Sequence, residues 1–600
     1  MKKILVPVLL VLFAGSCQFE PKETAWKPAE GPLLTQWADA VTPGSVLPEY
    51  PRPQMVREAW INLNGLWDYA IVPEAANRPR KFDGKIMVPF CPESSLSGVG
   101  KDVGPENRLW YRRTFKLPAE WAGKQIMLNF GASDWETRVW VNGTEVGSHK
   151  GGYDAFSFNI TDALKGKGRQ EIIVSVRDPV DQGTQPRGKQ VLNPEGIWYT
   201  SVTGIWQTVW LEPLSKEHIK SVQIIPDIDQ SQVTIIADLS EEALTGHMLE
   251  AVIYKEGNSI MSGISENNSF EIQIIDPILW TPDYPFLYDF ELDLIRMDGV
   301  KVDSIKGYFG MRKISLGKDE KGFTRMMLND EFVFQLGPLD QGWWPDGLYT
   351  APTDEALKYD IEVTKQLGFN MARKHVKVEP ERWYYWCDKL GLLVWQDMPS
   401  GDAYIGRNDP DITRTEESEE QFRIELREMI MEHFNHPSII VWVPFNEGWG
   451  QFKTGDIVNF IRELDANRLV NPTSGWADRN VGDIRDIHAY PGPAMPEPED
   501  QRAIVLGEFG GLGLPLEGHT WQEKDNWGYR SFDSRDALLE AYTALITELI
   551  PMAGKGLSAA VYTQTTDVEI EVNGLMTYDR SVIKMEPSKI YRMNKGLPPD

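Results

Sequence analysis

The chain has 600 residues, of which 42% are hydrophobic and 25% charged. At roughly 150 residues per domain this length predicts three or four domains, and the composition excludes a disordered or fibrous protein. The 88 acidic and 61 basic residues leave a net charge of −27. Nucleic acid is therefore excluded as the main partner, since phosphate binding needs clustered lysine and arginine. Three cysteines are too few for a disulfide framework or a multi-cysteine metal site.

The first residues have the pattern of an export signal. Residues 1–16 contain two lysines followed by an apolar run that is too short to span a membrane. Cys17 comes next, after Ala14-Gly15-Ser16, which resembles a bacterial lipoprotein processing box. We predict lipidation of Cys17 and an outer-membrane or periplasmic lipoprotein of a Gram-negative bacterium, held to the membrane only by its acyl chains. The alternative is an ordinary cleaved signal peptide with an incidental cysteine. Residues 17–48 are predicted to be a flexible tether.

Two all-β regions follow the predicted tether. Residues 49–215 contain short runs rich in β-branched and aromatic residues, separated by Gly, Asn, Asp and Pro, a pattern typical of an antiparallel sandwich. Asn142-Gly143 stands between two such runs and predicts a tight hairpin, because both central residues of that turn need positive φ. Residues 216–316 form a second all-β stretch with roughly the size of an immunoglobulin-like domain.

From residue 317 to residue 600 the chain alternates apolar runs with helical patterns, which is typical of βα units. Two helices are predicted between the first three runs, at 353–367 and 380–390. The eight runs are Phe332–Leu336, Phe369–Arg373, Leu392–Trp395, Ile439–Val443, Val470–Ser474, Ile484–His488, Ile504–Gly507 and Leu557–Tyr562. An open doubly wound sheet is the rival fold, but no glycine-rich dinucleotide fingerprint follows the first run. We therefore predict a (β/α)8 TIM barrel.

Polar residues follow almost every predicted strand, where the active site of a barrel forms. Glu447 and Glu508 each come almost directly after an apolar run. Such a pair suits glycosidic bond cleavage, in which one carboxyl protonates the leaving oxygen and the other attacks the sugar or activates water. Other residues predicted at the same mouth, and assigned to substrate binding, are Asp340, Arg373, His375, Asp397, Asn446, Trp449, Trp476, His488, Tyr490 and Gln564.

The aromatic residues near these strand ends support a sugar site. Flat rings stack against the C–H faces of sugars, while polar neighbours bind the hydroxyl groups. Trp343, Trp344, Trp449, Trp476 and Tyr490 are all predicted in or near the mouth. For any one of the tryptophans, burial in the core is the simpler interpretation.

A set of motifs stands in a fixed order along the chain. They are Leu63-Asn64-Gly65-Leu66-Trp67, Trp140-Val141-Asn142-Gly143, Gly368-Phe369-Asn370-Met371-Ala372-Arg373-Lys374-His375, Asn446-Glu447 and Gly507-Glu508-Phe509-Gly510. In this order they resemble the motifs of glycoside hydrolase family 2, the group of β-galactosidases, β-glucuronidases and β-mannosidases. The resemblance covers nearly all of the chain after the export signal. It implies a sugar-binding jelly-roll sandwich, an immunoglobulin-like sandwich and a C-terminal TIM barrel.

The resemblance also implies roles for individual residues. Glu508 would attack the anomeric carbon of a terminal β-linked sugar, and Glu447 would be the acid/base of a retaining reaction. Asn446 would bind the sugar 2-hydroxyl, and Arg373 would hold Glu508 ionised. The residues that would shape the non-reducing-end pocket are His375, Asp397, Trp476, His488 and Tyr490.

The identity of the sugar is predicted less directly. No clear Asn-x-Lys element of the kind that glucuronidases use on a uronate carboxylate is present, so we predict a neutral sugar, galactose first. Tyr562-Thr563-Gln564 stands where many relatives have a tryptophan platform, which leaves the floor of the pocket in doubt. β-Glucuronidase, β-mannosidase or another exo-glycosidase stays open. So do a catalytically inactive carbohydrate-binding protein and a structural surface protein.

The predicted partner is an oligosaccharide or a glycan derived from a polysaccharide. No cofactor is expected. The large galactosidases of the resembling family use magnesium and sodium, so a divalent cation stays open, but no metal site can be assigned from this sequence. Assembly into a homo-oligomer also stays open.

Overall fold

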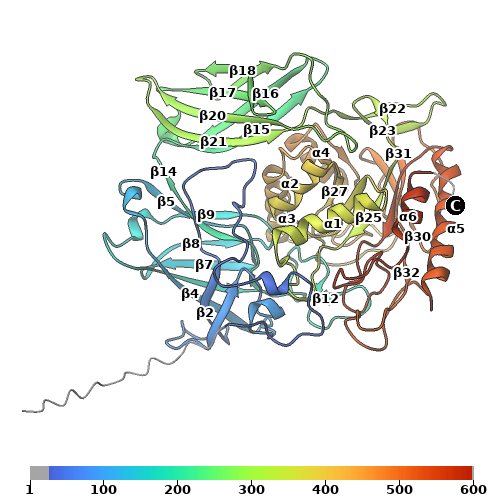
Figure 1. Cartoon of the computed structure of the whole chain (residues 1–600), viewed down its shortest axis with the longest axis horizontal. Helices are drawn as coiled ribbons and strands as arrows, with labels where there is room; N and C mark the ends of the chain where they lie inside the picture. The colour runs from blue at the N-terminus through green and yellow to red at the C-terminus, as the bar shows by residue number, and fades with distance from the viewer. Residues whose placement is uncertain (1–25, 597–600) are drawn as a thin grey trace, which may run out of the picture.

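The computed structural model describes residues 26–596, and it consists of three domains packed around one another (Figure 1). The predicted export signal and Cys17 lie outside the described residues. A jelly-roll sandwich and an immunoglobulin-like sandwich both lie against the C-terminal barrel. Within residues 26–596, no helix has the length and apolar content needed to cross a membrane.

The first domain is the predicted antiparallel sandwich. Its two main sheets have the strand orders β3-β2-β4-β10-β7-β8 and β1-β14-β5-β9. Asn142 and Gly143 have φ values of 52° and 90° between β7 and β8, so the predicted hairpin is confirmed. The strands are β1 (Ile61–Asn62), β2 (Gly65–Pro73), β3 (Gly84–Val88), β4 (Asn107–Phe115), β5 (Gln125–Phe130), β6 (Ser133–Asp134), β7 (Glu136–Val141), β8 (Thr144–Lys150), β9 (Phe156–Asn159), β10 (Gln170–Arg177), β11 (Gln190–Val191), β12 (Tyr199–Thr200), β13 (Gly204–Ile205) and β14 (Val209–Leu214).

The second domain is an immunoglobulin-like sandwich of a three-stranded sheet, β15-β16-β19, and a four-stranded sheet, β18-β17-β20-β21. Buried and exposed side chains alternate along β16, β17 and β20, so each strand presents one apolar face to the core between the sheets. The strands are β15 (Ile219–Asp227), β16 (Gln232–Leu239), β17 (His247–Lys255), β18 (Asn258–Ser265), β19 (Ser269–Gln273), β20 (Tyr288–Arg296) and β21 (Lys301–Phe309).

The third domain is built on eight parallel strands in the order β29-β28-β27-β26-β25-β34-β31-β30. The strands are β25 (Gln335–Asp340), β26 (Met371–Lys374), β27 (Leu393–Asp397), β28 (Ile439–Val443), β29 (Leu469–Val470), β30 (Ile484–Ala489), β31 (Ala503–Gly510) and β34 (Leu557–Thr563). The helices are α1 (Asp354–Gln366), α2 (Glu381–Leu390), α3 (Glu416–Glu432), α4 (Thr454–Leu464), α5 (Arg535–Ala553) and α6 (Pro587–Asn594). The predicted TIM barrel and its first two helices are confirmed. All five residues of β28 are buried, as expected for a strand covered on both faces.

The predicted first barrel strand is displaced in the structure. Residues 331–332 belong instead to β24 (Glu331–Phe332), which pairs with β23 (Thr324–Leu328). On its other edge β23 pairs with β22 (Ile314–Lys318), and the three strands form a small antiparallel sheet. The barrel strand starts at Gln335 and ends at Asp340. Short apolar runs have the same composition in both kinds of sheet, so periodicity could not separate them. Two further short strands, β32 (Leu512–Gly513) and β33 (Arg530–Ser531), pair beside the barrel.

The predicted tether is wrong for residues 26–48, which pack on both the jelly roll and the barrel. The Thr35 backbone N–H and hydroxyl donate to Asp346 Oδ2 at 2.8 and 2.7 Å. The Trp37 ring lies 5.1 Å from the ring of Tyr359 and 6.1 Å from that of Trp344. Aromatic side chains and buried hydrogen bonds therefore fix a segment whose polar and proline-containing sequence suggested a linker.

A jelly-roll segment, residues 183–200, is docked on the barrel loops. The backbone N–H groups of Arg187 and Gly188 donate to Ser400 O at 2.9 and 2.8 Å, and the Thr200 N–H donates to Glu569 Oε1 at 2.8 Å. Gly188 has φ +62°, and a Cβ there would lie 2.4 Å from Val376 O, so the close approach requires glycine. This contact brings the first domain to the edge of the barrel mouth.

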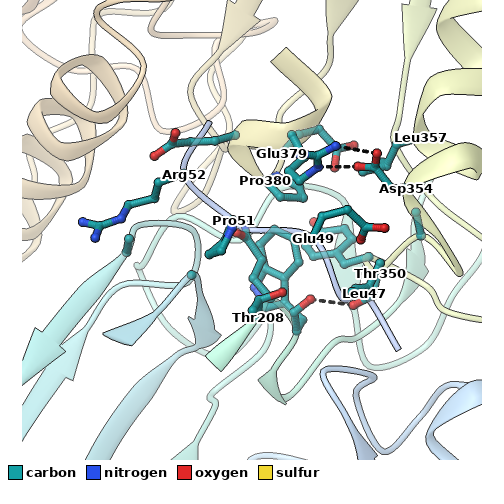
Figure 2. Close-up of a pocket in the computed structure, with 18 of the residues that line it drawn as sticks. Leu47, Glu49, Pro51, Arg52, Thr208, Thr350, Asp354, Leu357, Glu379 and Pro380 are labelled. Carbon is teal, nitrogen blue, oxygen red and sulfur yellow. Dashed lines mark hydrogen bonds and ion pairs between the residues drawn. The ribbon is translucent and has the colours of Figure 1, made fainter. Parts of the chain in front are cut away.

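The contact region between jelly roll and barrel also encloses a separate pocket (Figure 2). The pocket opens to solvent, and the space within it and its opening is about 770 Å³; its lining includes Glu49, Arg52, Asp354 and Glu379. The Arg382 guanidinium is paired with Asp354, with Nε 2.5 Å from Oδ1, at the edge of the pocket. Neither of the two predicted catalytic carboxylates lines it, so the pocket is distinct from the barrel mouth.

A buried carboxyl at this domain contact makes stability depend on pH. Glu425, on α3, is 4% exposed and accepts hydrogen bonds from Gln421 at 2.8 Å and from the Trp135 indole at 3.5 Å. Burial, together with the negative charge of Asp154, raises the pKa of Glu425 to about 8. The folded state therefore favours the neutral acid, and the stability it contributes is lost as pH rises from the ordinary value near 4.5 to about 8.

We expect Glu425→Gln, which keeps the neutral shape at all pH values, to stabilise the protein relative to wild type at pH 8.5 and not at pH 4.5. The gain at high pH should be about 1–3 kcal/mol. Unfolding midpoints by differential scanning fluorimetry across this range measure it. Glu420→Gln, on the exposed face of the same helix, is the matched control, and its difference in unfolding midpoint from wild type should not change with pH. If the difference in unfolding midpoint between Glu425→Gln and wild type also does not change with pH, the Glu425 carboxyl is not neutral in the folded state.

Candidate active site

The two predicted catalytic carboxylates meet at the carboxyl ends of β28 and β31. Glu447, Glu508 and His488 each place one ligand atom within 4.8 Å of the other two. Retaining glycosidases hold their carboxyl groups about 5–5.5 Å apart, whereas inverting enzymes leave about 6.5–9.5 Å for a water molecule. One oxygen of Glu447 and one of Glu508 lie within 4.8 Å of each other, which fits the closer of these two spacings.

The backbone around Glu447 turns sharply to present its side chain. Glu447 has a left-handed φ of 52°, which is uncommon for a residue with a side chain and is found at active sites. Its N–H donates to Ser474 O at 2.8 Å, and Ser474 N–H donates to Phe445 O at 2.9 Å. These bonds to the loop after β29 hold Glu447 at the mouth, where its side chain is 16% exposed.

Arg373, at the end of β26, connects the groups around Glu508. Its guanidinium is fully buried and donates to Glu508 Oε1 at 3.1 Å and to both oxygens of Asp397 at 3.0 and 2.8 Å. It also donates to Asn446 Oδ1 at 2.7 Å. Because the amide oxygen of Asn446 accepts from Arg373, its NH2 group is turned away from the guanidinium and is left to donate to a substrate.

The surroundings of Glu508 favour its ionised form. Burial alone would raise its pKa, but the positive charges of His488 and Arg373 outweigh burial and lower the pKa to about 2. The Tyr490 hydroxyl adds a hydrogen bond to Glu508 Oε2 at 2.6 Å. Glu508 is therefore a carboxylate at every pH at which the protein is expected to work, as a nucleophile must be.

His488 lies between the two carboxylates. Its Nδ1 is 2.8 Å from Glu447 Oε1 and 3.6 Å from Glu508 Oε2. Burial lowers the pKa of His488, but the charges of Glu508 and Glu447 and the bond to Glu447 outweigh burial and raise it. On the other side of the ring, Nε2 is 2.8 Å from the Ser474 hydroxyl, which donates to Asp486 at 2.6 Å. His488 is thus held in place against Glu447.

His375 is held by Asp397 beside Arg373. Its Nδ1 is 2.9 Å from Asp397 Oδ2, and its side chain is 1% exposed. Burial, with the nearby charges of Lys189 and Arg373, lowers the pKa of His375 well below its ordinary value, so the ring is neutral. A neutral imidazole fixed at Nδ1 leaves Nε2 to bind a sugar hydroxyl.

The predicted aromatic residues divide into two groups. Trp449 stacks on Trp198 of the jelly roll, with ring centres 4.8 Å apart, and Trp476 contacts the His488 ring edge-on at 6.0 Å. Tyr490 stacks flat on Tyr529 at 3.8 Å. Tyr490 bonds Glu508 and Trp476 contacts the ring of His488, while the sugar-binding role of all three aromatic residues stays a prediction.

Trp343 and Trp344 are core residues, which agrees with the simpler of the two interpretations of the sequence. They are 1% and 2% exposed. The Arg580 guanidinium lies 3.9 Å from the centre of the Trp344 ring, and Trp37 covers its edge. The N-terminal segment that covers Trp344 is remote in sequence, and so is Tyr199, whose ring packs edge-on against Trp343, so the burial of neither tryptophan could be read from the local pattern.

Two other predicted substrate-binding residues have protein partners instead. Asp340 pairs with Lys374 at 2.8 Å and accepts the Gly342 N–H at 2.9 Å. Gln564 is fully buried and donates to Asn573 Oδ1 at 2.9 Å. Neither the Asp340 nor the Gln564 side chain forms a hydrogen bond with the residues around the two carboxylates. Both therefore lie outside the hydrogen-bonded network that contains Arg373, His375, Asp397 and Asn446.

The sequence prediction missed Lys189, Trp198 and Tyr529. The first two come from the jelly roll and the third from the long segment between β32 and α5, so none of them follows a barrel strand. Tyr529 could have been suspected only from its aromatic neighbours, since Trp527 lies two positions before it. Among residues 26–596, Glu447, His488 and Glu508 are the one group of three His, Cys, Asp or Glu side chains that lie close enough together to share a metal ion.

Comparison with known proteins gives the same three domains in the same order. The family model for the sugar-binding domain of glycosyl hydrolases family 2 matches residues 101–213, a second model of that family matches 217–312, and its TIM barrel model matches 351–505. The chain belongs to glycosyl hydrolases family 2. The predicted family is therefore confirmed, together with the jelly-roll, immunoglobulin-like and barrel architecture.

Relatives within family 2 carry two different activity names. A β-galactosidase of Thermoanaerobacter pseudethanolicus is 30% identical over 454 residues, which are 72% of this chain and 57% of that protein. A β-glucuronidase of Paenibacillus borealis is 24% identical over 449 residues, 70% of this chain and 73% of that one. The chain spans about half the length of several curated relatives, including 44% of a putative β-glucuronidase of Formosa agariphila.

Solved structures show the same fold in other family 2 proteins. A β-D-glucuronidase from Dictyoglomus thermophilum superposes with a TM-score of 0.72 at 18% identity, covering 92% of this chain and 99% of that one. A putative β-galactosidase from Bacteroides fragilis gives 0.70 at 20% identity, covering 90% and 86%. At this identity the likeness shows the fold alone, so the choice of sugar depends on the site itself.

Proposed function

We propose that this family 2 protein is a retaining exo-β-glycosidase that removes a terminal non-reducing sugar by double displacement. The observation that carries the proposal is the pair Glu447 and Glu508, whose carboxyl oxygens lie within 4.8 Å of each other at the mouth of the barrel. Arg373 and Tyr490 bond only the second of these carboxylates, which separates their roles.

In the first displacement an oxygen of Glu508 forms a bond to the anomeric carbon while the bond from that carbon to the leaving oxygen breaks. The proton shared by Glu447 and His488 moves to the leaving oxygen. In the second displacement Glu447 takes a proton from water, and the water oxygen replaces Glu508 at the anomeric carbon. The two inversions restore the β configuration.

The hydrogen bonds around Glu508 are suited to this reaction. Arg373 keeps Glu508 ionised and fixes its direction, since it is itself held by both oxygens of Asp397. The NH2 group of Asn446 is free to bind the 2-hydroxyl, a bond that strengthens as positive charge develops on the sugar ring. A carbohydrate-binding protein without catalysis would not require a buried carboxylate so close to a second one.

The sequence predicts galactose as the sugar, and β-glucuronidase is the second candidate. The relatives' names support both. One observation favours an acidic sugar, namely the buried lysine that the jelly roll contributes to the mouth.

A panel of aryl β-glycosides tests the proposed function. We expect turnover of at least one member among the galactoside, glucoside, mannoside, xyloside, glucuronide and galacturonide. Proton NMR during the first minutes should show the β-anomer of the free sugar before mutarotation. Initial release of the α-anomer would contradict the proposed mechanism, and no turnover of any member would favour the carbohydrate-binding alternative.

A further inference from the structure

A lysine of the jelly roll reaches the catalytic centre of the barrel. Lys189 directly precedes β11, in the docked segment 183–200, and is 6% exposed. Its ammonium nitrogen lies 5.0 Å from the centre of the Trp449 ring and 5.9 Å from that of Trp198. Trp449 follows the acid/base Glu447 by two residues. The ammonium therefore lies beside a loop that carries a catalytic carboxylate.

Lys189 differs from the other buried lysines in having no anionic partner. Lys374, Lys377 and Lys584 each contact a carboxylate, at 2.8, 3.0 and 2.6 Å. Within residues 26–596, the Lys189 ammonium has no carboxylate within 4.0 Å and no hydrogen-bond acceptor, and only the two tryptophan rings face it. The side chain is buried while its ammonium nitrogen has no protein partner, so the ammonium is available to an anionic ligand that enters the mouth.

The charges around Lys189 indicate which part of the substrate it faces. Burial lowers the pKa of Lys189, while the carboxylates of Glu571, Glu508 and Glu447, in that order of strength, raise it. The nucleophile thus acts on the ammonium more strongly than the acid/base does. His375, which is bonded to Asp397 behind the nucleophile, also feels the charge of Lys189 more than that of Arg373. The ammonium therefore lies within electrostatic reach of both carboxylates that would flank the sugar.

The docking of the jelly roll fixes this position. On one side of Lys189, the backbone N–H of Gly188 donates to Ser400 O. On the other side, the side-chain amide of Gln190 donates to Asp134 Oδ2 at 2.8 Å. The Tyr199 hydroxyl, on the paired strand β12, donates to Glu571. The backbone on both sides of Lys189 is thereby held, so that the ammonium is placed in advance of substrate binding.

We propose that Lys189 binds an oxyanion carried by the sugar that Glu508 attacks, either the carboxylate of a uronic acid or a sulfate ester. The inference rests on the proposed glycosidase function and names its substrate class as acidic β-glycosides. An oxyanion supplies both the opposite charge and the acceptors that the ammonium lacks, whereas a hydroxyl supplies only an acceptor. Galactose, the neutral sugar predicted from the sequence, would leave the charge uncompensated.

The test compares acidic aryl β-glycosides with their neutral counterparts. The pairs are glucuronide with glucoside, galacturonide with galactoside, and galactoside 6-sulfate with galactoside. We expect wild type to have a higher kcat/KM for one acidic member. In Lys189→Met the ratio of acidic to neutral kcat/KM should fall at least tenfold, and Lys189→Arg should restore part of it. Lys167→Met, an exposed lysine of the same domain, is the matched control. The pair that responds distinguishes a carboxylate from a sulfate.

A wild-type preference for the neutral member of every pair would overturn the inference while leaving the proposed function intact. An equal fall in kcat/KM for the acidic and the neutral member of a pair in Lys189→Met would also overturn the inference and leave the proposed function intact. Binding measured by calorimetry in the Glu508→Gln background gives a readout that needs no turnover. A tenfold preference for the acidic aryl glycoside that disappears in Glu508→Gln/Lys189→Met supports the oxyanion site even if no substrate is cleaved, and equal affinities refute it.

Discussion

Replacement of Glu508 by glutamine should lower kcat by roughly 10⁴-fold or more on every aryl glycoside that wild type cleaves. The amide has nearly the shape of the carboxylate, and it can still bond Arg373 and Tyr490, but it cannot form the covalent bond to the anomeric carbon. Substrate affinity should change much less than kcat. Stopped assays over hours, with the purity of the variant checked against wild-type contamination, measure the loss.

Two further observations would make this result specific. A 2-deoxy-2-fluoro aryl glycoside of the preferred sugar should label wild type, and peptide mass spectrometry should place the label on Glu508. Glu548→Gln, the same chemical change on the exposed face of α5, should keep wild-type kcat. Labelling of a residue other than Glu508, or retention of more than a few per cent of kcat in Glu508→Gln, would assign the nucleophile elsewhere.

Replacement of Glu447 by glutamine should have an effect that depends on the leaving group. A 2,4-dinitrophenolate leaves without a proton, so the first displacement should proceed at close to its wild-type rate. An alkyl or sugar leaving group requires protonation, and its kcat/KM should fall by roughly 10²–10⁴-fold, the usual contribution of general acid catalysis. A plot of log kcat/KM against the leaving-group pKa should therefore be steeper in Glu447→Gln than in wild type.

The second displacement offers an independent check on the same residue. In Glu447→Ala no base activates water, so the glycosyl-enzyme from a dinitrophenyl substrate should accumulate. Added azide, which needs no base, should restore turnover and give the β-glycosyl azide. An equal loss of kcat/KM for good and poor leaving groups would show instead that Glu447 acts through structure, as would the absence of azide rescue.

The sequence alone predicted the three-domain order and the pair of carboxylates that meets at the barrel mouth. Apolar runs such as Ile439–Val443 are buried on both faces in any parallel barrel, and the residue after such a run must lie at its mouth. Glu447 and Glu508 could be found for this reason without knowledge of any contact. Arg373, His375 and Asp397 follow neighbouring strands and converge by the same rule.

Where the local sequence pattern and the tertiary packing give different surroundings for a side chain, the packing determines its surroundings. The sequence around Trp344 is that of an aromatic platform, but residues 26–48 cover it, and the prediction of a free tether missed that contact. Asp340 ends a barrel strand like the other site residues, yet its carboxylate pairs with Lys374 at the end of the neighbouring strand β26. Periodicity reports which face of an element is apolar, and it carries no information on which remote segment covers that face.

The same limit applies to the residue on which the substrate class depends. Lys189 lies in a polar jelly-roll segment, and nothing in its neighbourhood along the chain distinguishes it from an exposed lysine. Only the docking of that segment on the barrel loops buries its ammonium beside Trp449 and leaves it without a carboxylate. The residues proposed for the reaction follow barrel strands, whereas the residue proposed to select the sugar belongs to another domain, because electrostatic contact is set by distance in space and not by position in the chain.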